Sequence, residues 1–180
     1  MMTIKQLIVG SLQTNCYILK SNKTGIIIDP GAESKKIIEA VSDLKIQLIL
    51  ATHRHYDHID ALDDVKKAIG AKAAIHPFDW VDGFDIKLED GQKIAFNEEE
   101  ITVIHTPGHT PGGCCFLLGN NLFSGDTLFL GGLGNTSFPG GDEQAIFKSI
   151  KEKLLALSDE TKVYPGHGPA TTIGQERKLY

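Results

Sequence analysis

The chain has 180 residues, 41% hydrophobic and 23% charged, which predicts one globular domain spanning residues 1–180. A formal charge of −5, without a dense Lys/Arg cluster, excludes the electrostatic footprint of a nucleic-acid-binding protein. The N-terminus has no signal-peptide pattern, and no apolar run approaches the roughly 18 residues of a membrane span, so we expect a soluble, cytoplasmic protein.

The first third of the chain alternates short apolar runs with turn residues. Runs 6–9, 16–19 and 25–28 predict strands of an antiparallel meander. An amphipathic helix follows, with one apolar face formed by Ile37, Ile38, Val41 and Leu44. Residues 48–50 then predict a buried strand.

The middle of the chain predicts a second helix and a polar connection. The helix begins near Ile59, follows the apolar spacing of residues 62–69 and ends at Gly70. A short strand at 73–75 leads to the connection 79–90, where Trp80 and Phe84 either line the mouth of a site or are aromatic residues without a role. Residues 89–92 predict a hairpin turn.

The remaining chain predicts a second set of strands and helices. Strands are expected at 93–96, 101–104, 114–118, 122–123 and 162–164. A glycine-rich loop, 131–142, precedes a long helix whose inner face carries Ile146, Ile150, Leu154 and Leu157. A short terminal helix follows later in the chain, and Thr172 is expected to cap it. Two successive sets of strands with helices indicate two packed sheets with helices on the outer faces.

The three cysteines do not predict a disulfide framework, because they are too few and unsuitably spaced. Cys114 and Cys115 are adjacent in a predicted strand, so their side chains should point to opposite faces. We interpret all three, with Cys16, as small buried apolar residues.

A cluster of metal-binding residue types follows the strand at 48–50. Residues two apart in an extended segment point the same way, so His53 and His55 can bind one ion together. Asp57 and His58 lie where the chain turns into a helix and face a different direction, toward a second ion. Imidazole beside carboxylate suits zinc, iron or manganese; the alternative is a polar loop rich in histidine.

Three later strands also end in candidate ligands. Segment 105–112 offers His105 and His109, Gly125-Asp126-Thr127 offers a carboxylate, and 164–168 offers His167. Counting these candidates assigns His53, His55 and His109 to one ion, Asp57, His58 and His167 to the other, and Asp126 to a bridge between them. Such open coordination is typical of a catalytic site, in which two metals lower the pKa of a shared water.

In these motifs the chain resembles the metallo-β-lactamase fold superfamily, and more narrowly the small glyoxalase II-like hydrolases (hydroxyacylglutathione hydrolase family). The resemblance runs almost end to end, through Thr14-Asn15-Cys16-Tyr17, Asp29-Pro30-Gly31, the histidine cluster, 105–112, 125–129, 139–142 and 164–176. It implies an α/β fold, a four-layer αββα sandwich of two mixed sheets with a binuclear site at one edge. It also implies that His105 is not a ligand.

Departures from the family limit what is carried over, and one is a connection between His76 and Asp90 that is shorter than usual. Family members commonly have Gly-Arg where this chain has Gly134-Asn135, so any substrate contact made by that arginine is absent. Dedicated glyoxalase II enzymes carry a further C-terminal helical domain that helps to bind glutathione, and we expect none here.

The residues and the resemblance together predict a metal-dependent hydrolase of thioesters or related esters. A metal-bridging hydroxide is the expected nucleophile, two zinc ions are the expected cofactors (with iron or manganese as alternatives), and Asp57 is the acidic residue expected to manage the proton. We expect a small-molecule substrate and a monomer or homodimer. The alternatives are a mononuclear iron persulfide dioxygenase, a lactonase or phosphodiesterase, and a non-enzymatic binding protein.

Overall fold

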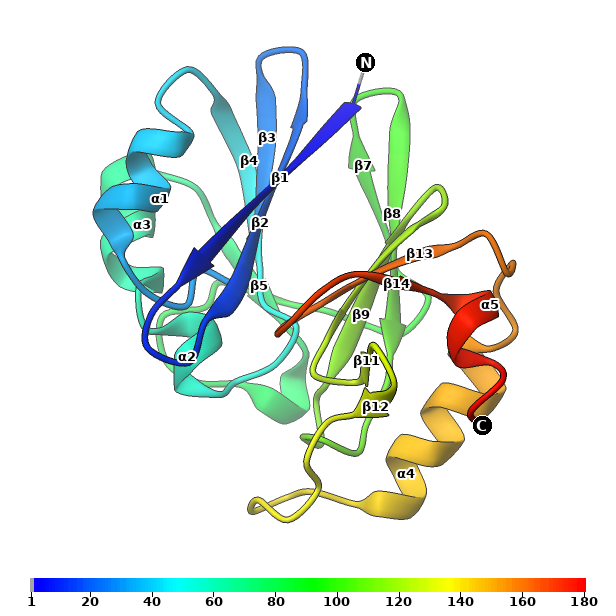
Figure 1. Cartoon of the computed structure of the whole chain (residues 1–180). Helices are drawn as coiled ribbons and strands as arrows, with labels where there is room; N and C mark the ends of the chain where they lie inside the picture. Colours follow the sequence, from blue (N-terminus) through cyan, green and yellow to red (C-terminus); the bar gives the residue numbers. More distant parts are fainter. Residues whose placement is uncertain (1) are drawn as a thin grey trace.

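The computed structural model describes residues 2–180 and contains two six-stranded mixed sheets packed against each other (Figure 1). The first sheet has a meander, β1–β3, continued by three parallel strands. Its strands, in spatial order, are β1 (Met2–Val9), β2 (Thr14–Ser21), β3 (Thr24–Ile28), β4 (Lys45–Leu50), β5 (Ala73–Ile75) and β6 (Ile86–Lys87).

The second sheet is built from the later strands and is antiparallel except between β10 and β13. In spatial order it contains β14 (Thr171–Thr172), β13 (Lys162–Pro165), β10 (Asn121–Gly125), β9 (Cys114–Leu118), β8 (Glu99–His105) and β7 (Lys93–Phe96). A small separate ribbon pairs β11 (Leu128–Phe129) with β12 (Gly132–Leu133).

Helices cover the outer face of each sheet (Figure 1). Helices α1 (Ser34–Ala40) and α3 (Leu62–Ile69) cover the first sheet, with the short α2 (Tyr56–Ile59) at its edge. Helices α4 (Glu143–Lys148) and α5 (Ile173–Glu176) cover the second. Between the sheets lies an apolar core to which both contribute, including Tyr17, Leu50, Phe116 and Phe123. The predicted αββα sandwich is therefore confirmed.

Several local predictions are also confirmed. Gly70 ends α3 with φ +68°, which glycine adopts without strain, and the Thr172 hydroxyl caps α5 by accepting from Gln175 N. Cys114 faces the core between the sheets, whereas Cys115 faces the helices, and both are free thiols. Within residues 2–180, no helix combines the length and apolarity that a membrane crossing requires.

Other local predictions were wrong. The helix expected near Ile59 already begins at Tyr56, because α2 is a separate single turn before α3. Residues 89–92 do turn, with Gln92 N donating to Glu89 O, but they join β6 and β7 of different sheets and form no hairpin. The first helix ends at Ala40, before Leu44. The long helix continues past Lys148 as a π-helical segment, Ser149–Leu154, and excludes Leu157.

Candidate metal centre

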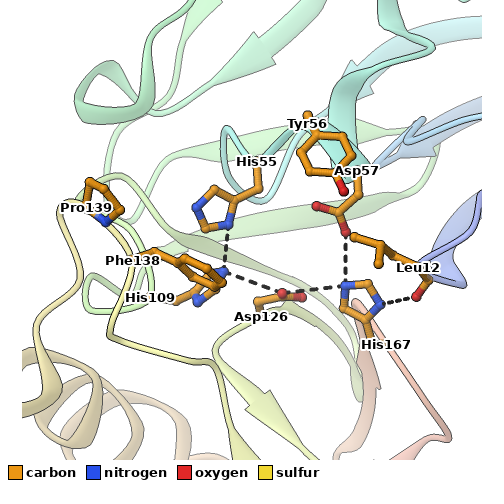
Figure 2. A pocket seen from close by; sticks show the side chains of 9 residues that line it. All are labelled: Leu12, His55, Tyr56, Asp57, His109, Asp126, Phe138, Pro139 and His167. Atoms are coloured by element: carbon orange, nitrogen blue, oxygen red, sulfur yellow. Dashed lines mark hydrogen bonds and ion pairs between the residues drawn. The ribbon is translucent and has the colours of Figure 1, made fainter.

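All seven predicted ligand side chains lie at one edge of the sandwich, although they come from five segments. His53 and His55 follow β4, and Asp57 and His58 form the first turn of α2. His109, Asp126 and His167 follow β8, β10 and β13 of the second sheet. Figure 2 shows five of the seven around one cavity, with Asp126 between His109 and His167.

The donor atoms form three overlapping triads in which all atoms lie within 4.8 Å of one another. The triads are His53–His55–His109, His53–His58–Asp126 and Asp57–His58–His167. His55 Nδ1 lies 3.1 Å from His53 Nε2 and 2.9 Å from His109 Nε2. Asp126 Oδ2 lies 3.5 Å from His109 Nε2 and 3.6 Å from His167 Nε2, so this carboxylate links the two outer triads.

Hydrogen bonds on the far side of four imidazoles fix the ring orientation. His109 Nδ1 donates to Asn135 O at 2.7 Å, His167 Nδ1 to Leu12 O at 3.1 Å, and His58 Nδ1 to Asp29 Oδ2 at 2.9 Å. The Thr52 hydroxyl donates to Asp29 Oδ2, so it accepts from His53 Nδ1. In each ring Nε2 therefore faces the centre, as in metal-binding histidines whose other nitrogen is held by an acceptor.

Two buried carboxylates outside the cluster hold the loops that carry it. Asp29 accepts from Thr52 N and Thr52 Oγ1, both at 2.7 Å, in addition to His58. Asp29 orients the His58 imidazole from a backbone with φ +54°. Asp79, fully buried in the 3₁₀ turn η1 (Pro77–Asp79), accepts from Arg54 N, Thr110 Oγ1 and Gly112 N.

The electrostatics differ between the two ends of the cluster. Burial, reinforced by neighbouring imidazoles, lowers the pKa of His53 well below its usual value and also lowers that of His55, so both are neutral. At the other end, burial opposes but does not outweigh Asp126 and Asp29, which raise the pKa of His58 well above its usual value. Against the effect of burial, hydrogen bonding with His167 helps to lower the pKa of Asp57. This end therefore favours a positive charge.

Close backbone approach leaves no room for side chains behind the cluster. A Cβ on Gly166 would lie 2.2 Å from Asp126 Oδ1 and 2.6 Å from His58 Cε1. A Cβ on Gly125, where φ is +48°, would lie 2.4 Å from Thr52 Oγ1. Glycine at these positions therefore lets two strand ends meet the histidine loop.

The chemistry of the donor set fits divalent metal ions. Asp126 Oδ1 is buried and, within residues 2–180, it is the only such side-chain atom without a hydrogen-bond partner. Leaving a carboxylate oxygen buried without a partner is costly, and a cation beside it would offset that cost. Inward-facing imidazole nitrogens and carboxylates are ligands that suit zinc, iron and manganese.

A cavity of about 510 Å³ opens directly onto this cluster. Five of its lining side chains are candidate ligands, and the other four are Leu12, Tyr56, Phe138 and Pro139 (Figure 2). Trp80 and Phe84, which were candidates for the mouth of the site, do not line it: Phe84 is buried under the first sheet, and the Trp80 ring lies beneath Lys87 Nζ. Leu12 and Phe138 were not anticipated, since nothing in a single exposed apolar loop residue marks it as part of a cavity.

The two remaining histidines lie outside the three triads. The rings of His76 and His105 stack at 3.9 Å between centroids, and His76 Nδ1 caps the 3₁₀ turn by accepting from Phe78 N. These contacts give His76 a structural role, whereas the expectation that His105 is not a ligand stays a prediction. Asp79 was missed, because an isolated aspartate in a polar connection carries no local signal of a buried role.

Comparisons with known proteins match nearly the whole chain. The model of the family described as the metallo-beta-lactamase superfamily matches residues 9–167. The hydroxyacylglutathione hydrolase GloC of Haemophilus influenzae is 33% identical over 98% of this chain and 96% of that protein.

Solved structures of similar proteins give the same picture. BLEG-1 B3 metallo-beta-lactamase is 33% identical with a TM-score of 0.91, covering 98% of this chain and 97% of that one. TTHA1623, solved in a di-iron-bound form, is 34% identical with a TM-score of 0.86, covering 97% of both chains. ETHE1 from Myxococcus xanthus is 28% identical with a TM-score of 0.91, covering 98% of this chain and 82% of that one.

Proposed function

The chain belongs to the metallo-beta-lactamase superfamily, and from this premise we propose that it is a binuclear metallohydrolase that cleaves thioesters. The observation that carries the proposal is the convergence of three overlapping donor triads on one open cavity. The likeness to GloC supports thioesters as the substrate class. The single apolar core shared by both sheets supports treating the chain as one domain.

We assign the seven residues as predicted, with one ion at His53, His55 and His109, one at Asp57, His58 and His167, and Asp126 between them. Two divalent ions held there would lower the pKa of a water and polarise a substrate carbonyl. The net reaction adds one water: a C–O bond forms, the C–S bond breaks, and the acid and the thiol leave. Zinc as the metal and the cytoplasm as the location stay predictions.

The protein side chains hold the reacting groups in place. The Thr14 hydroxyl donates to Asp57 Oδ2 at 2.9 Å, which keeps the carboxylate at the cavity wall, close to His167. Its lowered pKa keeps Asp57 ionised, so it would accept the proton of water only transiently before the proton passes to the departing thiolate. Phe138 and Tyr56 line the cavity and would reduce the access of bulk water once a substrate is bound.

The test is an assay of the purified protein after metal loading and elemental analysis. We expect two divalent ions per chain and hydrolysis of S-lactoylglutathione or of simpler thioesters. Lactones and a β-lactam serve as alternative substrates. A fully loaded protein that cleaves no thioester would contradict the proposal.

A second candidate function is the persulfide dioxygenase, favoured by the likeness to ETHE1. That activity is expected from one iron held by two histidines and a carboxylate. One iron per chain together with oxygen uptake on glutathione persulfide would establish it in place of the hydrolase. The complete second triad, Asp57–His58–His167, supports the hydrolase instead.

A further inference from the structure

The cavity over the metal centre has apolar walls on both sides of the reactive groups. Figure 2 places Leu12 beside His167 and Phe138 beside His109, on opposite sides of Asp126. Leu12, Tyr56 and Phe138 are 50%, 66% and 49% exposed, unusually open for large apolar side chains that share one cavity. A substrate bound across the centre would therefore contact apolar surface at both ends.

Both walls are attached to the candidate ligands. The Leu12 carbonyl accepts from His167 Nδ1 at 3.1 Å. This hydrogen bond holds the turn between β1 and β2 against the imidazole. The Phe138 ring lies 5.5 Å from the His55 ring and 6.2 Å from the His109 ring, measured between centroids. The Leu12 backbone and the Phe138 ring thus lie directly beside candidate ligands.

Among residues 2–180, no lysine or arginine side chain lines the cavity to meet an anionic substrate. Apart from the histidines, the charged groups among its lining residues are the carboxylates of Asp57 and Asp126. Arg54, on the same loop as His55, has its Nε 3.9 Å from the buried Asp79 carboxylate. Asn135, whose backbone carbonyl holds His109, is uncharged and has its side-chain oxygen occupied by Ser137 N.

On the basis of the proposed function, we propose that the substrates are uncharged thioesters with an apolar acyl chain, and that glutathione conjugates are disfavoured. Glutathione carries two carboxylates and one ammonium, and desolvating those carboxylates against apolar walls that lack a lysine or arginine side chain is costly. An acyl chain instead gains from contact with these walls. Each methylene removed from water contributes about two- to fourfold in affinity at partly open walls of this kind.

The first experiment uses thioethers, which lack the thioester carbonyl and therefore have no C–S bond that a thioester hydrolase could cleave. Calorimetry on the metal-loaded protein compares S-methyl- and S-hexyl-N-acetylcysteamine with S-hexylglutathione. We expect the hexyl compound, with five more methylenes, to bind about 30-fold or more tighter than the methyl compound. We also expect S-hexylglutathione to bind no tighter than its uncharged counterpart. Tighter binding of the glutathione compound, or equal binding of methyl and hexyl, overturns the inference.

A matched pair of variants locates the effect. Phe138→Ala should reduce the hexyl-over-methyl preference about threefold, whereas Phe78→Ala should not. Phe78 is also an exposed phenylalanine, at 64%, but it lies outside the cavity beside His76. If Phe138→Ala leaves the hexyl-over-methyl preference unchanged, Phe138 does not contact the alkyl chain, and this wall is not part of the substrate site.

Hydrolysis assays run in parallel separate this inference from the proposed function. S-Hexanoyl-N-acetylcysteamine should have a higher kcat/KM than S-lactoylglutathione. If neither is cleaved but the thioether preference holds, the hydrolase proposal fails and the apolar ligand class stands. If S-lactoylglutathione is cleaved with the higher kcat/KM, the hydrolase stands and the apolar class fails.

Discussion

Asp79 joins the two loops that carry His55 and His109, and its replacement should loosen one metal site selectively. Its carboxylate accepts from Arg54 N at 3.2 Å, Thr110 Oγ1 at 2.5 Å and Gly112 N at 2.9 Å. Arg54 is next to His55, and Thr110 is next to His109. The 2.9 Å separation of these two imidazoles therefore depends on a carboxylate that neither of them contacts.

The magnitude follows from the donors left without an acceptor. Asp79→Asn keeps the shape but turns an amide toward these donors, which costs about 2 kcal/mol in free energy of unfolding for one buried bond lost. Asp79→Ala leaves all three donors without an acceptor and opens a cavity, which costs about 4 kcal/mol because such losses are not additive. Affinity for the ion at His53, His55 and His109 should fall about 10- to 100-fold, as for other groups that orient metal ligands.

Two measurements separate misplaced ligands from general unfolding. Urea titration of metal-free protein gives the free energy of unfolding, and competition with a chromophoric chelator gives the affinity of each ion. We expect Asp79→Asn to weaken one ion and leave the other, at Asp57, His58 and His167, within about threefold. Asp43→Asn, at an exposed carboxylate paired with Lys20, is the control and should change neither quantity appreciably. Equal weakening of both ions, or of neither, would refute the reasoning.

Four further predictions concern pH, packing, metal and charge. Burial, with the neighbouring His105, lowers the pKa of His76 to about 4, so stability present above pH 6.5 is lost as the pH falls toward 4. His76→Asn can still cap the 3₁₀ turn and should remove on the order of 2 kcal/mol of that dependence in urea titrations; an unchanged pH profile would count against it. Gly166→Ala should displace Asp126 and lower the metal content, whereas Gly132→Ala, whose Cβ meets nothing within 4 Å, should not; equal metal contents would argue against the packing explanation. Removing metal with a chelator should lower the Tm in scanning calorimetry, since an ion at about a thousand times its Kd stabilises by about 4 kcal/mol; an unaltered Tm would show that these residues bind no ion. Asn135→Arg should raise kcat/KM for S-lactoylglutathione about threefold relative to an uncharged thioester, the effect of one partly exposed ion pair, and a constant ratio would place this residue outside substrate range.

The candidate site could be predicted from the sequence because its signals are local. Each of the seven residues lies within the 53–58 cluster or within four residues of a strand end, and strand ends of a layered fold tend to meet at one edge. The layered architecture was predictable for a similar reason, since strand and helix periods alternate along the chain.

The features that the sequence analysis missed or predicted wrongly depend on how the segments pack in the folded chain. Residues 89–92 have hairpin chemistry, but turn residues do not specify which sheet the next strand joins. The spacing of four between Ile146, Ile150 and Leu154 fits an α-helix, yet the segment from Ser149 widens to a π-helix. Asp79 and the wall residue Phe138 acquire their roles only from neighbours at least 25 positions away in sequence.

Each donor triad takes two members from residues 53–58 and the third from the second sheet. Neither sheet alone can therefore give an ion three protein ligands, and each bound ion would act as a clasp between the layers. Sliding of one layer past the other would release the metal before the strands themselves separate. The rate of metal loss would then report how often the sandwich opens, in a protein whose secondary structure stays intact.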